Sequence, residues 1–150
     1  MHSRSLETPL GTLTVTVQND AITALNWQPG GADTLPLLLE AERQLLAYFD
    51  HDLQAFDLPL RPDGDSFQQS VNQAMCNIPF GETREYGEIA RDLGSMPQPV
   101  GNACGRNTIP IIIPCHRVVG ATGLGGFSAP GGVETKVALL KHEGAYGLLL

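Results

Sequence analysis

The sequence predicts a small α/β unit followed by a mostly helical unit that contains a helix-turn-helix. Apolar and polar residues alternate over 12–17, as they do in a half-buried strand. Apolar residues then recur at helical spacing over 38–49, and two short helical segments flank a glycine-containing turn within 86–105. A chain of 150 residues can hold two small domains. We expect them at 1–63 and 64–150.

The first unit is expected to be a β-hairpin and one helix. Residues 18–20 read Gln-Asn-Asp, which is a turn composition, and an extended pattern resumes over 21–27. A proline and two glycines within 28–32 end this second strand. Residues 58–66 place proline and glycine beside charged side chains. They are the best candidate for a linker.

The second unit is expected to contain three helices before its cysteine-bearing motif. The first covers about 67–77 and is stopped by Ile78-Pro79. Apolar residues share one helical face over 86–93, and residues 94–97 turn the chain into a third helix at about 99–105. This last helix consists of small residues. Such a composition suits either close packing between helices or insertion into a DNA minor groove, which is only about 6 Å wide.

The net charge of −7 is unfavourable for a protein that binds phosphates. The charge is uneven, however. Residues 1–64 hold nine acidic and three basic side chains, whereas residues 65–150 hold seven acidic and six basic ones. A nucleic-acid surface is therefore expected in the second half, where it would rest on a few local contacts.

Composition also narrows the class of protein. No stretch approaches the roughly 20 apolar residues of a membrane span, and the first residues lack the apolar core of a signal peptide. We therefore expect a cytoplasmic protein that does not bind membranes. The three cysteines form no CxxC pair, which argues against a disulfide framework and a paired-cysteine zinc site. Cys76 and Cys104 are expected to be free thiols packed in the core.

Cys115 is the strongest candidate for a reactive residue. It follows the apolar run 111–113, which the pattern predicts to be a buried strand, and it lies between Pro114 and the polar pair His116-Arg117. Pro114 fixes its own φ and holds the preceding residue extended, so the next side chain is aimed reproducibly. A thiol presented where the chain leaves the core is suited to act as a nucleophile.

Cys115 needs a base, because a thiol with the ordinary pKa of about 8.5 is only a few per cent ionised at neutral pH. Neighbouring side chains on a strand point to opposite faces. His116 can therefore serve only if the chain bends after Pro114 or if a water molecule bridges the two side chains. Glu143 is the best candidate to orient the imidazole. The alternative is that Glu143 is an ordinary carboxylate at a helix end.

At these residues the chain resembles a known family, the O6-alkylguanine-DNA alkyltransferases. The segment Ile113-Pro-Cys-His-Arg-Val118 is similar to the family's active-site signature, which is highly specific. The resemblance is strong over residues 66–147, whereas the first half resembles the family's variable domain only in size and general pattern. It implies a ribonuclease-H-like α/β domain followed by a winged helix-turn-helix-like domain. Further matches are Ile78-Pro-Phe-Gly-Glu-Thr83, Tyr86-Gly-Glu-Ile-Ala90, Val100-Gly101, Asn107 with Pro110, Gly126-Phe-Ser128, Gly131-Gly132 and His142-Glu-Gly144.

The resemblance implies that the alkyl group passes from O6 of guanine to Cys115 in an irreversible SN2 step, once per molecule and without a cofactor. Whether O4-alkylthymine is a second substrate stays open. His116 would deprotonate Cys115 through a water molecule, and Glu143 would polarise His116. Asn107 would bridge the helix-turn-helix and the active-site segment. Tyr86 would donate a hydrogen bond toward the guanine and help to rotate the nucleotide out of the duplex, which costs a few kcal/mol.

The partner that the resemblance implies is double-stranded DNA with an alkylated guanine, bound by a monomer through the helix at 99–105. Phe127 would form a wall of the pocket, and Ser128 and its backbone would contact the oxygen that loses its alkyl group. Arg117 would support the fold through a salt bridge, with a DNA contact as the alternative. The residues expected to bind substrate or DNA are Gln98, Val100, Gly101, Asn102, Phe127 and Ser128.

Two features depart from the family pattern. Most members have an arginine finger that fills the gap left by the flipped base, whereas this chain has Gln98, which predicts weaker DNA affinity or slower flipping. The inserted Ala129-Pro130 lengthens the pocket loop. No cysteine precedes Cys76, so we expect no zinc site of the kind that some relatives have near the N-terminus, and no metal elsewhere.

The rival hypotheses are a non-catalytic protein that binds alkylated DNA and recruits repair factors, a helix-turn-helix regulator with a redox-sensing cysteine, and a cysteine hydrolase.

Overall fold

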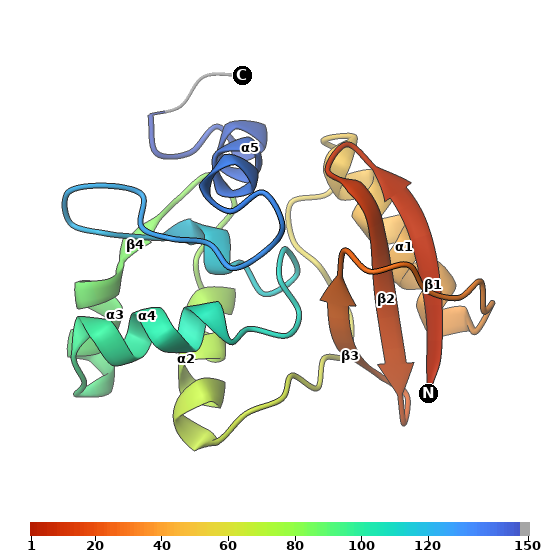
Figure 1. Cartoon of the computed structure of the whole chain (residues 1–150), viewed down its shortest axis with the longest axis horizontal. Coiled ribbons are helices and arrows are strands. Elements are labelled where there is room, and N and C mark those ends of the chain that lie inside the picture. Colours follow the sequence, from red (N-terminus) through yellow and green to blue (C-terminus); the bar gives the residue numbers. More distant parts are fainter. Residues whose placement is uncertain (148–150) are drawn as a thin grey trace. The chain divides into compact units, whose positions relative to one another are not determined.

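The computed structural model describes residues 1–147 and divides into two compact units, Met1–Pro62 and Asp63–Leu150 (Figure 1). Residues 148–150, which end the predicted second domain, lie outside the described residues. The predicted order of a small α/β part and a mostly helical part is confirmed. The elements are β1 (His2–Thr8), β2 (Gly11–Gln18), β3 (Ala21–Asn26), α1 (Pro36–Phe49), α2 (Ser66–Cys76), β4 (Arg84–Glu85), α3 (Tyr86–Leu93), α4 (Pro97–Gly105), the 3-10 turn η1 (Cys115–Arg117), β5 (Val118–Val119) and α5 (Val133–Glu143).

The first unit is an antiparallel sheet in the order β1-β2-β3, with α1 packed against β1 and β2. The turn between β2 and β3 has φ of 52° at Asn19 and 62° at Asp20. Two central residues with positive φ are typical of the two-residue hairpin turn whose twist matches that of the flanking strands. Leu13, Val15 and Val17 of β2 lie in the core. The predicted hairpin and helix are therefore confirmed.

The predicted linker over 58–66 is divided between the two units. Ile22 N–H donates to the Pro59 carbonyl at 2.8 Å, and Arg61 N–H donates to the Ile22 carbonyl at 2.7 Å. Residues 59–61 therefore run parallel to β3 and extend the sheet of the first unit. The second unit begins at Asp63.

The helices of the second unit begin and end at the residues that their sequences favour. The Asp65 side chain accepts a backbone N–H at 2.9 Å and caps α2. Glu85 and Glu88 form a capping box at the start of α3, and Gly94, with φ of 65°, ends that helix. Helix α4 begins at Pro97, two residues before the predicted start, because the fixed φ of proline suits the first position of a helix.

The predicted strand over 111–113 is wrong. Ile111 has φ of 72°, a left-handed conformation that β-branched residues rarely adopt, and Ile112 N–H donates to the Pro110 carbonyl at 2.9 Å. Ile111 is therefore the central residue of a γ-turn. All three isoleucines are nevertheless at most 6% exposed. An apolar run identifies a buried segment, but it does not distinguish a strand from a turn that packs inside.

Two short strands position the next part of the chain. Strands β4 and β5 pair in parallel, Arg84 with Val118 and Glu85 with Val119. Because Tyr86 follows β4 and the turn η1 precedes β5, this pairing fixes the start of α3 relative to the segment that carries Cys115. In the described part of the chain no helix is long and apolar enough to cross a membrane, and no group of three or more His, Cys, Asp or Glu side chains could hold a metal ion.

Candidate active site

Cys115 is the first residue of η1 and is presented by a sharp bend. Its N–H donates to the Ile113 carbonyl at 2.8 Å across Pro114, which has φ of −82° and ψ of 69°. These values are those of an inverse γ-turn. The chain then enters a 3-10 turn, in which Arg117 N–H donates to the Pro114 carbonyl at 3.0 Å. The bend that His116 requires after Pro114 is therefore present.

Asn107 braces this bend against the end of α4. Its Nδ2 donates to the Ile113 carbonyl at 2.8 Å, and its Oδ1 accepts the Ile109 N–H at 3.0 Å. Its own N–H donates to the Cys104 carbonyl in the last turn of α4 at 3.3 Å. One amide therefore joins α4 to the turn before Cys115, at the position where the sequence predicted a bridging residue.

Glu143 accepts hydrogen bonds from two buried side chains. His116 Nε2 lies 2.8 Å from its Oε2, and Arg117 bonds to both of its oxygens at 2.9 Å. Arg117 also donates to the Ile78 carbonyl at 2.6 Å and is 6% exposed, so it forms the expected salt bridge and is not available to DNA. Although burial opposes ionisation, the bonds from His116 and Arg117 hold the pKa of Glu143 at about 2.

The geometry fixes the tautomer of His116. Burial lowers the pKa of His116, against the opposing effect of Glu143, so the imidazole is neutral. An ionised carboxylate can only accept, so the proton of the neutral ring must lie on Nε2. Nδ1 then carries a lone pair, and it has no hydrogen-bond partner among residues 1–147. His116 is therefore a neutral imidazole, and its Nδ1 makes no hydrogen bond to any of these residues, the Cys115 sulfur included.

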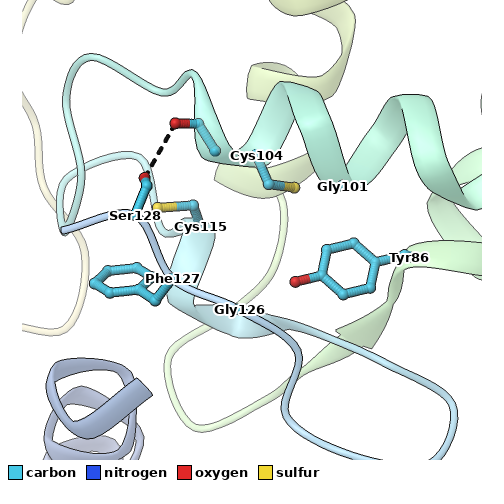
Figure 2. Close-up of a pocket in the computed structure, with 8 residues that line it drawn as sticks. Tyr86, Gly101, Cys104, Cys115, Gly126, Phe127 and Ser128 are labelled. Carbon is cyan, nitrogen blue, oxygen red and sulfur yellow. Dashed lines mark hydrogen bonds between the residues drawn. The ribbon is translucent and has the colours of Figure 1, made fainter. Parts of the chain in front are cut away.

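Cys115 lines a pocket of about 440 Å³ in the second unit (Figure 2). Its side chain is 6% exposed. Burial raises the pKa of its thiol, while the hydrogen bond from Asn107 and the charge of Lys136 favour the thiolate. The other residues that line the pocket are Tyr86, Gly101, Cys104, Gly105, Gly126, Phe127 and Ser128.

Four predicted site residues share this pocket with Cys115. Tyr86 points into it from the start of α3, and Gly101 lies on the α4 side (Figure 2). Phe127 and Ser128 come from the long loop before α5, and the Ser128 hydroxyl donates to the Gly105 carbonyl at 3.0 Å. Burial is the main cause that raises the pKa of Tyr86 to about 12, so its hydroxyl stays protonated.

The remaining predicted residues lie along α4 and differ in exposure. Gln98 and Asn102 are exposed. Val100 was expected to contact DNA. This expectation is wrong, because Val100 is 0% exposed and its side chain packs in the core. The reason is helical spacing, because Val100, Ala103 and Cys104 share the inward face of α4.

Lys136 was missed by the sequence analysis. It is fully buried, and its Nζ donates to the carbonyls of Val118 at 2.7 Å, Leu124 at 2.6 Å and Gly126 at 3.2 Å. Nζ also lies 3.4 Å from the Tyr86 hydroxyl. Burial lowers the pKa of Lys136 to about 8. The available signal was its position in α5, where it shares the helix face of buried leucines at i+3 and i+4.

Two cysteines also differ from expectation. Cys76 is exposed at the end of α2 and does not pack in the core. Cys104 is buried as expected, but it also lines the pocket. Sequence periodicity could place Cys104 on the inner face of a helix, but not beside the active-site turn.

The chain is similar to known proteins over most of its length. A family model described as "6-O-methylguanine DNA methyltransferase, DNA binding domain" matches residues 66–145. A methylated-DNA–protein-cysteine methyltransferase of Methanosarcina acetivorans is 40% identical over 97% of this chain and 99% of its own, and one of Mycobacterium leprae is 42% identical over 95% and 92%. The crystal structure of Mycobacterium tuberculosis O6-methylguanine methyltransferase is similar with a TM-score of 0.85 and 40% identity, over 95% of this chain and 92% of its own. This chain belongs to the 6-O-methylguanine DNA methyltransferase family.

Proposed function

We propose that this chain repairs O6-alkylguanine in DNA by transferring the alkyl group to Cys115. The observation that carries the proposal is a pocket-lining thiol followed in the chain by a neutral histidine whose Nε2 is held by Glu143. Family membership supports the same reaction. The thioether product is not hydrolysed under cellular conditions, so each molecule would act once and would need no cofactor.

The proton path follows from the tautomer of His116. Nδ1 has a free lone pair but makes no hydrogen bond to the sulfur, so a bridging water would carry the proton from Cys115 to His116. The resulting imidazolium would be stabilised by the Glu143 carboxylate, 2.8 Å from Nε2. The Cys115 thiolate would then attack the alkyl carbon while the bond from that carbon to O6 breaks.

Tyr86 and Lys136 would stabilise the guanine that leaves. The Lys136 ammonium can only donate, so the Tyr86 oxygen accepts from it and keeps its own proton free for a substrate atom. Because the pKa of Tyr86 is raised to about 12, its hydroxyl remains a donor at neutral pH. A donor at this position lowers the energy of the anion that forms on the purine. Because the Ser128 hydroxyl donates to the Gly105 carbonyl, the backbone N–H of Ser128 would contact the oxygen that loses the alkyl group. Phe127 would pack against the base.

DNA would bind along the exposed side of α4. A base inside a duplex hides its O6 substituent, so the nucleotide has to be rotated into the pocket. Gln98 and Asn102 are the exposed predicted residues of α4, and Gly101 joins this surface to the pocket. A mycobacterial homologue with 40% identity has been crystallised in complex with DNA. We propose that the protein acts as a monomer in the cytoplasm, with 1–63 and 64–150 as separate domains.

The reaction is tested by intact-protein mass spectrometry after incubation with a duplex that contains O6-methylguanine. We expect a gain of one methylene per molecule, located on the peptide that contains Cys115. Cys115→Ser should gain nothing, and Cys76→Ser, which alters an exposed cysteine outside the pocket, should react like the wild type. Tight binding to the damaged duplex without a mass change would identify a non-catalytic binder instead.

A further inference from the structure

A second thiol shares the pocket with the alkyl acceptor. Cys104 comes from the inner face of α4 and Cys115 from η1, and both line the same pocket (Figure 2). Both residues are 6% exposed, and both line this pocket. The third cysteine, Cys76, is exposed and lies outside the pocket. The chain therefore places two of its three cysteine thiols in the pocket where a transferred alkyl group would lie.

The two sulfurs are close enough to affect each other's ionisation. Burial, together with the negative charge of the Cys115 thiolate, raises the pKa of Cys104 to about 12. Cys104 therefore stays a thiol while Cys115 is the nucleophile, and it does not compete for the alkyl carbon. Once Cys115 is a neutral thioether, its charge no longer opposes ionisation of Cys104. The first transfer thus removes one of the two effects that oppose ionisation of Cys104, while burial continues to oppose it.

The pocket restricts where the transferred alkyl group can lie. Because Cys115 is buried, a group bonded to its sulfur has to occupy the pocket of about 440 Å³. Three of the other lining residues are glycines, and the rest, besides Cys104, are Tyr86, Phe127 and Ser128. Cys104 is the softest nucleophile among them. A second electrophilic carbon on the transferred group would therefore share the pocket with a second thiol.

We propose that Cys104 captures the second reactive carbon of a bifunctional alkyl group after Cys115 has accepted the first. The substrate class is O6-alkylguanine whose alkyl group carries a leaving group on its second carbon, such as 2-chloroethyl. This inference rests on the alkyl transfer proposed above. Its consequence is that the remaining reactive end is consumed inside the protein and cannot alkylate the DNA.

Both steps balance as simple displacements. In the first, the Cys115 sulfur bonds to the carbon attached to O6, the bond from carbon to oxygen breaks, and the guanine anion takes up a proton. In the second, the Cys104 thiol loses its proton to solvent and its sulfur bonds to the second carbon. The bond from that carbon to chlorine breaks, and chloride leaves with the electron pair. The product is an ethylene bridge between the two sulfurs.

The test uses the full chain and a freshly prepared duplex with one O6-(2-chloroethyl)guanine, under reducing conditions. Trypsin cleaves after Arg91, Arg106 and Arg117, so Cys104 and Cys115 fall in the adjacent peptides 92–106 and 107–117. A covalent bridge keeps the two cleaved peptides together, and fragmentation together with the mass distinguishes it from a peptide left uncut after Arg106. We expect a joined peptide whose mass corresponds to ethylene in place of two thiol hydrogens.

The controls separate this inference from the proposed function. In Cys104→Ser and Cys104→Ala we expect the joined peptide to disappear and Cys115 to carry a chloroethyl or hydroxyethyl group alone, whereas Cys76→Ser should keep the bridge. The yield of the joined peptide is counted per modified Cys115, so a variant that transfers the alkyl group more slowly still tests the bridge. A duplex with O6-ethylguanine should give a single thioether on Cys115 in every one of these proteins.

Two outcomes overturn the inference while alkyl transfer stands. One is a wild-type protein that carries the same single thioether as Cys104→Ser. The other is transfer of ethyl without any transfer of chloroethyl, which would exclude the substrate class. If neither duplex modifies Cys115, the proposed function itself is wrong and the inference falls with it.

Discussion

Glu143 of α5 holds the two buried polar side chains that follow Cys115, His116 and Arg117. Its carboxylate fixes the tautomer of His116 and neutralises the buried Arg117. Its pKa in the folded protein, about 2, lies below the ordinary value of 4.5. Ionised Glu143 therefore stabilises the folded state fully above about pH 4.5. This stabilisation is lost as the pH falls from there toward 2.

Glu143→Gln removes this charge and leaves Arg117 buried without a counter-ion. We expect the free energy of unfolding at pH 7 to fall by about 3–5 kcal/mol, because breaking a buried ion pair leaves an uncompensated charge. Urea denaturation measures it, and Glu134→Gln, an exposed glutamate on the same helix, should change little. Between pH 5 and pH 2 the variant should lose less stability than the wild type. Equal losses would contradict the low pKa assigned to Glu143.

Turns, and not a helix or a strand, present the Cys115 side chain to the pocket. A γ-turn at Ile111 and an inverse γ-turn at Pro114 precede the 3-10 turn that begins at Cys115. A left-handed conformation at a β-branched residue is strained. Burial of the three isoleucines and the Asn107 brace hold the segment in this shape.

The strain at Ile111 predicts an asymmetry between two buried isoleucines. Ile111→Gly loses a core side chain but relieves the positive φ, whereas Ile109→Gly loses a side chain of the same kind at a residue without positive φ. We expect Ile111→Gly to be less destabilising, by about 1–2 kcal/mol. Urea titrations of both variants measure the difference. Equal or reversed losses would show that Ile111 is not strained.

Helix α4 is the other element with a testable property. Gln98 is exposed in its first turn, where the family resemblance places an arginine finger. We expect Gln98→Arg to bind damaged duplex more tightly or to transfer methyl faster, because a charged side chain adds a phosphate contact and fills the gap of the flipped base. Fluorescence anisotropy and single-turnover rates measure both effects. No change in either would remove Gln98 from the DNA-binding surface.

At the scale of the whole molecule, few positively charged side chains are available to bind DNA phosphates. Of the six basic residues after position 64, Arg117 and Lys136 are buried, and Arg84 is paired with Asp92 at 2.9 Å. The other three are exposed and are Arg91, Arg106 and Lys141. The net charge of −7 adds long-range repulsion.

This charge distribution predicts a shallow salt dependence of DNA binding. With at most three phosphates neutralised by side chains, the logarithm of the affinity should fall with the logarithm of salt concentration with a slope of about −3 or smaller in magnitude. Anisotropy titrations between about 50 and 200 mM NaCl measure the slope. A slope two or three times steeper would mean that the DNA contacts charged residues beyond these three.

The sequence by itself determined the parts of this protein that depend on local pattern. Alternation and helical periodicity predicted the hairpin, the helices and the fold class, since each reflects which side of an element is buried. The motif around Cys115 predicted the family and the nucleophile. Glu143 was identified as a candidate, with an ordinary helix-end carboxylate as the alternative, because nothing local shows what a distant carboxylate contacts.

Only the tertiary structure decided which side chains meet. It joined His116 and Arg117 to Glu143, buried Val100 and brought Cys104 into the pocket of Cys115. It also replaced the predicted strand at 111–113 by a γ-turn. The contacts of Glu143 with His116 and Arg117 join residues far apart in the chain. A local pattern indicates only whether a residue is buried. Whether a residue is buried and which residue it contacts are separate properties, and only the packing between elements determines the contact.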